Sequence, residues 1–188
     1  GGVTMTGTLA VTGAATISAG LVKLIQNNAL GSAAGATSVT AGATVQLVGT
    51  GLTIPEPITL NGDGLATNQG AIRNPGGSNI WTGAITLGAS ARIVSTGTAT
   101  DGSDSLVLKG NIATVSGAIL TMDVIRGMRL TGVISGAGGF TKNSSDTLLL
   151  YSTASNTYSG ITTINDGVVR IQNTKSLGDS SSVTTAQT

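Results

Sequence analysis

Pairs of large aliphatic residues, each pair separated by one small or polar residue, recur along the sequence. Such a pair places both side chains on one face of a β-strand, because successive side chains of a strand point to opposite sides. The pairs are Leu52 and Ile54, Ile58 and Leu60, Ile85 and Leu87, Leu106 and Leu108, and Leu148 and Leu150. The pattern predicts many short strands.

Turn-forming residues separate these strands at short intervals. Glycine accepts positive φ angles, and Asn and Asp bond to their own backbone, so pairs of these residues favour turns. They occur at residues 61–64, 74–77, 101–102, 136–139 and 165–167. Glycine and β-branched residues interrupt every stretch that would suit a helix of about 10 to 15 residues. We therefore predict an all-β chain with no significant helix.

An internal repeat favours a solenoid over a β-sandwich. Residues 160–178 match residues 13–31 without a gap at an offset of 147, with seven identities in nineteen positions. The similarity extends upstream with a shorter spacer in the first copy, so that residues 138–178 form a partial repeat of residues 1–31. We interpret residues 1–188 as one continuous β-helix segment, taken from a longer array.

A parallel β-helix suits these residues physically. Its coils stack ~4.8 Å apart, and small aliphatic side chains form columns in a narrow core. We expect such a core to hold few bulky aromatic residues, in agreement with 2% aromatic residues. At roughly 20–25 residues per coil, the chain would make about eight coils and a rod ~40 Å long.

Composition excludes several kinds of chemistry. The chain has no histidine and no cysteine, which excludes a histidine-based triad, a cysteine nucleophile, the usual zinc sites and disulfides. A net charge of +1 argues against nucleic acid as a partner. Mean hydropathy of +0.31 argues against disorder. No apolar run approaches the ~18 residues of a membrane-spanning helix, so we expect a soluble segment whose native start lies upstream of Gly1.

Residues 138–178 contain five motifs in a fixed order. They are Gly138-Gly139-Phe140-Thr141-Lys142, Thr147-Leu148-Leu149-Leu150, Asn156-Thr157-Tyr158-Ser159-Gly160, Thr162-Thr163-Ile164-Asn165-Asp166-Gly167 and Ser176-Leu177-Gly178. This order and spacing resemble the autotransporter-associated β-strand repeat, also called the passenger-associated transport repeat. The first copy lacks the Asn-Thr-Tyr turn, and residues 144–146 replace the usual Gly-rich step of the family.

The resemblance implies a bacterial surface or secreted protein with a right-handed parallel β-helix passenger. Members of this family commonly reach the cell surface through a C-terminal outer-membrane barrel, and the repeat serves as scaffold and as an aid to folding outside the cell. The resemblance transfers no catalytic residue to this chain.

Acidic residues recur near the predicted coil length. Asp101, Asp104, Asp123 and Asp146 would stack along one face and bind calcium or perform acid–base chemistry. The cations available to assist them are Lys109, Arg126, Arg129 and Lys142. The interpretation we favour is that these Asp residues cap turns. Lys109, Arg126 and Arg129 also form a candidate basic patch, which we interpret as solvated surface charge.

Aromatic residues suggest a second kind of site. Trp81, Tyr151 and Tyr158 would form a sugar-stacking platform if all three faced outward, whereas the alternative is packing against turns or strand edges. Asn143-Ser144-Ser145 matches a glycosylation acceptor, which is irrelevant in most bacteria. Gly136–Gly139 lacks the Lys-Ser/Thr step and the helix of a phosphate-binding loop.

The sequence therefore predicts a structural segment of a bacterial surface or secreted fibre or autotransporter passenger. We expect a rigid stalk or adhesive scaffold that is not an enzyme, with no cofactor, no metal and no catalytic residue. The expected partners are further copies of the chain, cell-surface partners or glycans. Self-association is expected because the strand edges at the ends of a β-helix favour end-to-end stacking. The alternative hypothesis is a glycan-active or glycan-binding β-helix domain.

Overall fold

The computed structural model describes residues 2–5, 12–66, 69–97, 105–179 and 184–186. Within these ranges the chain forms twenty short strands joined by turns, with no helix. None of the described residues therefore belongs to a helix long and apolar enough to cross a membrane. The prediction of an all-β chain is confirmed.

The strands are arranged in three rows, and every pairing within them is parallel. The first row contains β2 (Ala15–Ile17), β4 (Thr37–Val39), β7 (Ile58–Gly62), the start of β10 (Ile85–Ser95), β12 (Ile112–Thr114) and β15 (Ile134–Gly136). The second row contains β1 (Gly2–Met5), β3 (Gly20–Leu24), β5 (Ala43–Leu47), β8 (Ile72–Asn74), the end of β10, β13 (Ile119–Val124), β16 (Gly139–Asn143), β18 (Thr162–Ile164) and β20 (Thr184–Ala186). The third row contains β6 (Thr53–Ile54), β9 (Asn79–Trp81), β11 (Leu106–Leu108), β14 (Met128–Leu130), β17 (Thr147–Leu150) and β19 (Val168–Ile171).

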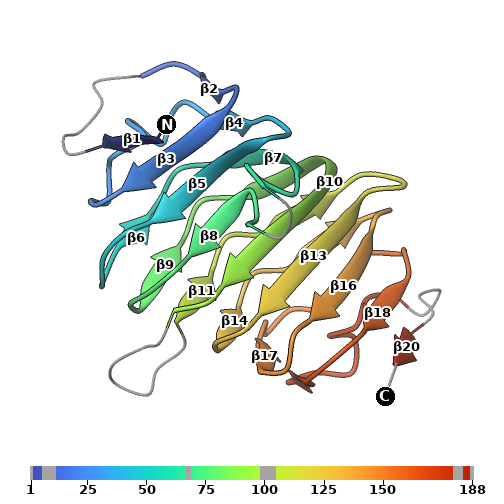
Figure 1. Cartoon of the computed structure of the whole chain (residues 1–188). Coiled ribbons are helices and arrows are strands. Elements are labelled where there is room, and N and C mark those ends of the chain that lie inside the picture. The colour runs from blue at the N-terminus through green and yellow to red at the C-terminus, as the bar shows by residue number, and fades with distance from the viewer. Residues whose placement is uncertain (1, 6–11, 67–68, 98–104, 180–183, 187–188) are drawn as a thin grey trace.

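Strand β10 joins the first two rows into one sheet. Its first residues pair with β7 and β12, whereas its last residues pair with β8 and β13. The register shifts between Leu87 and Ala91, so the strand bends from one side of the molecule to the next. From β4 to β17 the chain visits the three rows in turn on every circuit, which makes the architecture a parallel β-helix. Figure 1 shows the strands of the second row as arrows that lie side by side, stacked one after another from the N-terminal to the C-terminal end of the molecule.

Coil length varies more than the predicted range. Ala15 pairs with Thr37, one coil of 22 residues, whereas Ile58 pairs with Ile85 and Ile85 with Ile112, two coils of 27 residues. The extra residues lie in the turns and in the bend of β10, because the other strand pairs keep their register. Nine strands along the second row at ~4.8 Å spacing give a body ~40 Å long, in line with the expected rod.

Inward-facing aliphatic side chains form columns along the axis. In the second row the successive partners are Val22, Val45, Ile72, Ile93, Met122, Lys142 and Ile164. Of these, Val45, Ile72, Ile93 and Met122 are fully buried. Trp81, Phe140 and Tyr158 are fully buried as well, so the core accepts three bulky rings, contrary to our expectation for a narrow bore.

The two copies of the internal repeat fold alike locally but lie on different sides of the helix. Each forms a strand, a glycine turn and a second strand; φ is 85° at Gly20 and 73° at Gly167. Strand β2 belongs to the first row, however, whereas its counterpart β18 belongs to the second. The second copy, 147 residues further along the chain, therefore occupies the next row of the β-helix.

Glu56 is a carboxyl group enclosed at the turn between the third and first rows. It is 4% exposed, and its Oε1 accepts a hydrogen bond from Thr37 Oγ1 at 2.8 Å. Its backbone oxygen accepts one from Trp81 Nε1 at 3.0 Å. Burial raises the pKa of the Glu56 carboxyl, and the Thr37 bond opposes this shift only partly. Folding therefore favours the neutral form.

The substitution Glu56→Gln should stabilise the protein at neutral pH. Because the folded pKa is raised, the wild type loses stability relative to the neutral variant as pH rises through that pKa. The advantage of Glu56→Gln, measured by urea unfolding, should disappear at pH values below the unfolded pKa of ~4.3. An equal loss of stability in the variant at every pH would contradict this assignment.

Candidate functional site

The predicted acidic column does not form a catalytic pair among the described residues. Asp101 and Asp104 lie outside the described residues. Asp123, in β13, is 6% exposed and accepts hydrogen bonds from Arg92 Nη1 at 2.6 Å and Asn143 Nδ2 at 3.0 Å. Asp123 is thus a buried ion-pair partner within a strand, and the expectation that it caps a turn is wrong.

Asp146 behaves as expected for a turn residue. Its Oδ1 accepts a hydrogen bond from the backbone N–H of Thr147 at 2.7 Å, immediately before β17. Within the described parts of the chain, no three acidic residues are placed to hold a metal ion. Asp123 and Asp146 therefore have structural partners that account for their positions.

A continuous chain of polar side chains crosses five successive coils. Arg92 forms an ion pair with Asp123, and its Nε lies 3.6 Å from Oδ1 of the half-exposed Asp63. Asp123 continues the chain through Asn143, whose Oδ1 accepts a hydrogen bond from Asn165 Nδ2 at 2.7 Å. These contacts connect residues 20 to 31 positions apart in sequence, so each one ties a coil to the next.

Lys142, in β16, is a buried charged residue next in sequence to Asn143 of this chain of polar side chains. Its side chain is fully buried, and its Nζ donates hydrogen bonds to the backbone oxygens of Asn143 at 3.1 Å, Asp166 at 2.9 Å and Ser144. Burial lowers the pKa of the Lys142 ammonium group, while the charges of Asp166, Asp146 and Asp123 oppose this shift. The alternative in which Lys142 assists surface carboxylates does not fit the structure, because β16 places this side chain in the core column.

The turns around the Lys142 ammonium group depend on a glycine at position 167 and on a positive φ angle at Ser144. A Cβ atom on Gly167 would lie 2.7 Å from Lys142 Nζ and 2.6 Å from the Ser144 oxygen. Ser144 itself has a φ of 70°, a conformation that few non-glycine residues adopt. The Thr-Lys and Asn-Asp-Gly motifs of the repeat are therefore two halves of one contact between neighbouring coils.

The three aromatic candidates do not form an exposed platform. Trp81 and Tyr158 are fully buried, and Tyr158 packs edge-on against Phe140 with ring centroids 6.3 Å apart. Burial raises the pKa of the Tyr158 hydroxyl, which shares a hydrogen bond of 2.5 Å with Thr162. Tyr151 alone is partly exposed, and the Arg129 guanidinium carbon lies 5.7 Å from its ring centroid.

The remaining sequence motifs have ordinary structural positions. Lys109 and Arg126 are exposed, and Arg129 is half-buried. The Asn143 side chain bonds to Asp123 and Asn165 rather than projecting freely. Gly136 ends β15 and Gly139 begins β16, with no helix between or after them in the described residues.

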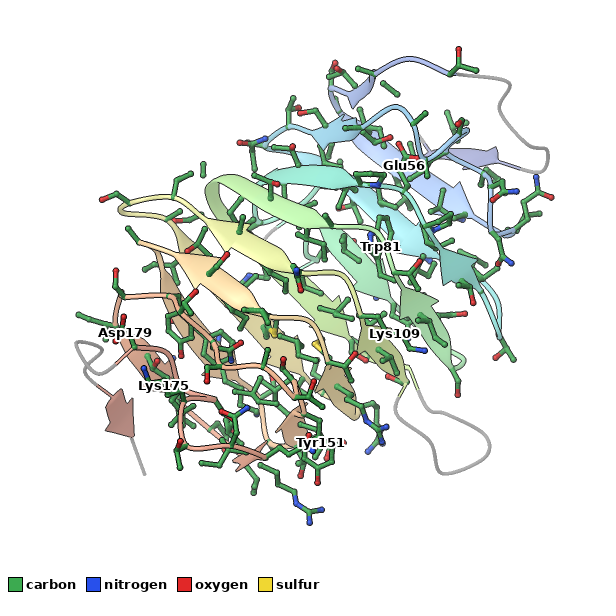
Figure 2. The ribbon with its side chains drawn as sticks, turned by 180° about the vertical axis from the view of Figure 1, so that it is seen from behind. Glu56, Trp81, Lys109, Tyr151, Lys175 and Asp179 are labelled. Atoms are coloured by element: carbon green, nitrogen blue, oxygen red, sulfur yellow. The ribbon has the colours of Figure 1, made fainter. Side chains whose placement is uncertain are left out.

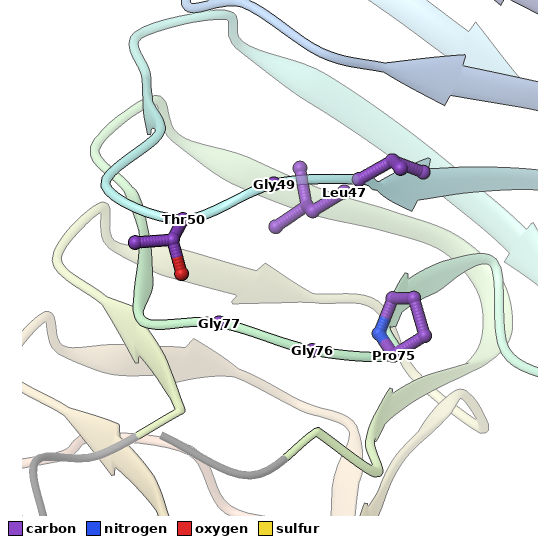
Figure 3. Close-up of a pocket in the computed structure, with 7 residues that line it drawn as sticks. Leu47, Gly49, Thr50, Pro75, Gly76 and Gly77 are labelled. Carbon is purple, nitrogen blue, oxygen red and sulfur yellow. The ribbon is translucent and has the colours of Figure 1, made fainter. Parts of the chain in front are cut away.

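Two shallow hollows lie on the surface of the described residues, and no charged side chain lines either of them. One of about 420 Å³ is lined by residues 47–50 and 75–77, of which three are glycine and the others are Leu47, Val48, Thr50 and Pro75 (Figure 3). The other, of about 320 Å³, is lined by glycine, alanine and threonine residues together with the exposed Ile119 and Ile161. Neither supplies groups for acid–base chemistry.

Sequence reasoning missed Arg92, Asn143 and Asn165 as one network. Their common signal is a spacing of one coil, but coil length varies between neighbouring pairs, from 20 residues for Asp123 and Asn143 to 31 for Arg92 and Asp123. A fixed-period search therefore cannot align these residues.

Comparison with known families supports the resemblance seen in the motifs. Residues 140–171 match the family model of the passenger-associated-transport-repeat. This range begins at Phe140, in the strand that carries Lys142, and ends with β19, so it contains both halves of the Lys142 contact. No match was found among curated proteins or among solved structures.

Replacing Lys142 with methionine should destabilise the protein. Methionine fills a similar volume but leaves the three backbone oxygens without their donor, which should cost about 2–4 kcal/mol in the free energy of unfolding. Lys109→Met is the matched control at an exposed lysine and should change stability by less than about 0.5 kcal/mol. Urea unfolding measures both variants, and a Lys142→Met protein as stable as the wild type would refute the proposed role.

Proposed function

We propose that the chain is a rigid β-helical segment of a bacterial surface or secreted passenger, with a mechanical rather than a catalytic role. The observation that carries this proposal is the Lys142 contact, which lies inside the matched repeat and fastens two coils together. A repeat of a passenger-associated family supports a surface or secreted location.

The distribution of polar groups supports a scaffold. The buried polar side chains Asp123, Asn156 and Lys142 all bond to neighbouring coils. Asn156, for example, accepts from the Ile134 N–H at 2.8 Å and donates to the Ser176 oxygen at 2.6 Å. Buried polar side chains that are hydrogen-bonded between coils stiffen the rod, and they have little capacity left for acid–base chemistry.

Surface labelling of the producing bacterium tests the location. An antibody raised against this chain should label intact, unpermeabilised cells or detect the protein in the culture medium. The control is an antibody against a cytoplasmic protein, which should label only permeabilised cells. Labelling of this chain that also appears only after permeabilisation would reject the proposal.

We also propose that the 188-residue chain associates with itself through its C-terminal end. Among the described residues, strand β19 is the last of the third row, and its Val168 and Ile171 are 51% and 52% exposed. An outer strand with exposed aliphatic residues favours pairing with another strand.

Light scattering tests this association. The mass of the wild-type chain should rise with concentration, and Val168→Lys with Ile171→Lys should suppress the rise because like charges would face each other at the strand edge. The control pair is Val115→Lys with Ile125→Lys, at residues 44% and 45% exposed but away from β19. Strictly monomeric wild type at high concentration, or equal suppression by both pairs, would refute the proposal.

A further inference from the structure

Three cations, Lys109, Arg129 and Arg170, lie on the outer face of the third row. Register places Arg129, Leu149 and Arg170 in one outward column of successive coils. A parallel column contains Lys109, Thr131 and Tyr151, because each of these residues donates its backbone N–H to the coil before it. We call Lys109, Arg129, Tyr151 and Arg170 the cationic face.

Charge on this face is of one sign within the described residues. Neither column contains a carboxylate, and neither Lys109 nor Arg170 forms an ion pair with a described Asp or Glu. Asp146 and Asp166 lie in the turns before β17 and β19, where their charges act on Lys142. Asp101 and Asp104, which precede Lys109 in the sequence, lie outside the described residues. Lys109 and Tyr151 lie on the same side of the molecule in Figure 2.

Tyr151 adds an aromatic surface to these charges. The Arg129 guanidinium lies 5.7 Å from its ring centroid, so the two side chains hold each other in place. An aromatic ring beside guanidinium groups suits a sugar unit that bears a carboxylate, because the ring contacts the C–H face while arginine binds the anion.

We propose that the cationic face binds a linear polysaccharide that carries carboxylate groups. Arg129 and Arg170 are two coils apart, about 10 Å, and the residue between them is Leu149. Such sparse charge suits a polyuronate better than a nucleic acid strand, whose phosphates repeat every ~3.4 Å and need a denser cationic surface. This site differs from the predicted three-ring platform, because two of those rings are buried.

Binding to polygalacturonate at low salt tests the proposal, with fully methyl-esterified polygalacturonate as the uncharged control polymer. The chain should bind the charged polymer, bind the ester weakly or not at all, and lose binding as salt screens the charges. Lys109→Gln with Arg170→Gln should weaken binding about three- to tenfold. The matched control, Lys23→Gln with Lys175→Gln, makes the same change in net charge elsewhere and should leave affinity unchanged.

Tyr151 distinguishes a sugar site from a general polyanion site. Tyr151→Ala should weaken polygalacturonate binding, whereas Tyr151→Phe should retain it, with unfolding midpoints showing that both variants are folded. Equal weakening by both charge-changing pairs, or equal affinity for polygalacturonate, polyglutamate and single-stranded DNA, would overturn the proposal. Failure to bind polygalacturonate above its methyl ester would overturn it as well, without bearing on the scaffold role.

Discussion

Parallel pairing of each coil with the next is the constraint on which the rest of this structure depends. Once three rows of strands are in register, every residue lies ~4.8 Å from its counterpart in the neighbouring coil. Inward-facing side chains of successive coils must then pack on one another, which explains why the column from Val22 to Ile164 is mostly aliphatic. Side chains of neighbouring coils must also be compatible where they are not direct register partners. Arg92 and Asp123, whose own partners are Thr121 and Val94, meet this requirement with a diagonal ion pair.

Lys142 is the charged exception within the second-row core column. Its aliphatic stem packs where Met122 and Ile164 lie in adjacent coils, while its ammonium group reaches backbone oxygens at the next turn. A buried cation of this kind is costly unless its donors are satisfied, so its value lies in specifying which turn may stack above it. This gives the Lys and Gly positions of the matched repeat a physical reason.

The repeat is a local unit whose place on the solenoid is not constant. Coils of 22 and 27 residues coexist, and the second copy has moved by one side relative to the first. A longer array built in this way would distribute equivalent surfaces around the rod rather than along one line. The cationic face, by contrast, depends on the register of the third row alone.

The sequence by itself determined the strands, the glycine turns and the family resemblance, because alternation and turn chemistry are local properties. It also determined that cysteine and histidine chemistry are absent. Only the tertiary structure decided which side chains meet: it buried Trp81, Tyr158 and Lys142 and brought Arg92 to Asp123. These contacts join residues whose spacing depends on the length of each coil, and that length is set by how the turns pack rather than by a fixed period in the sequence.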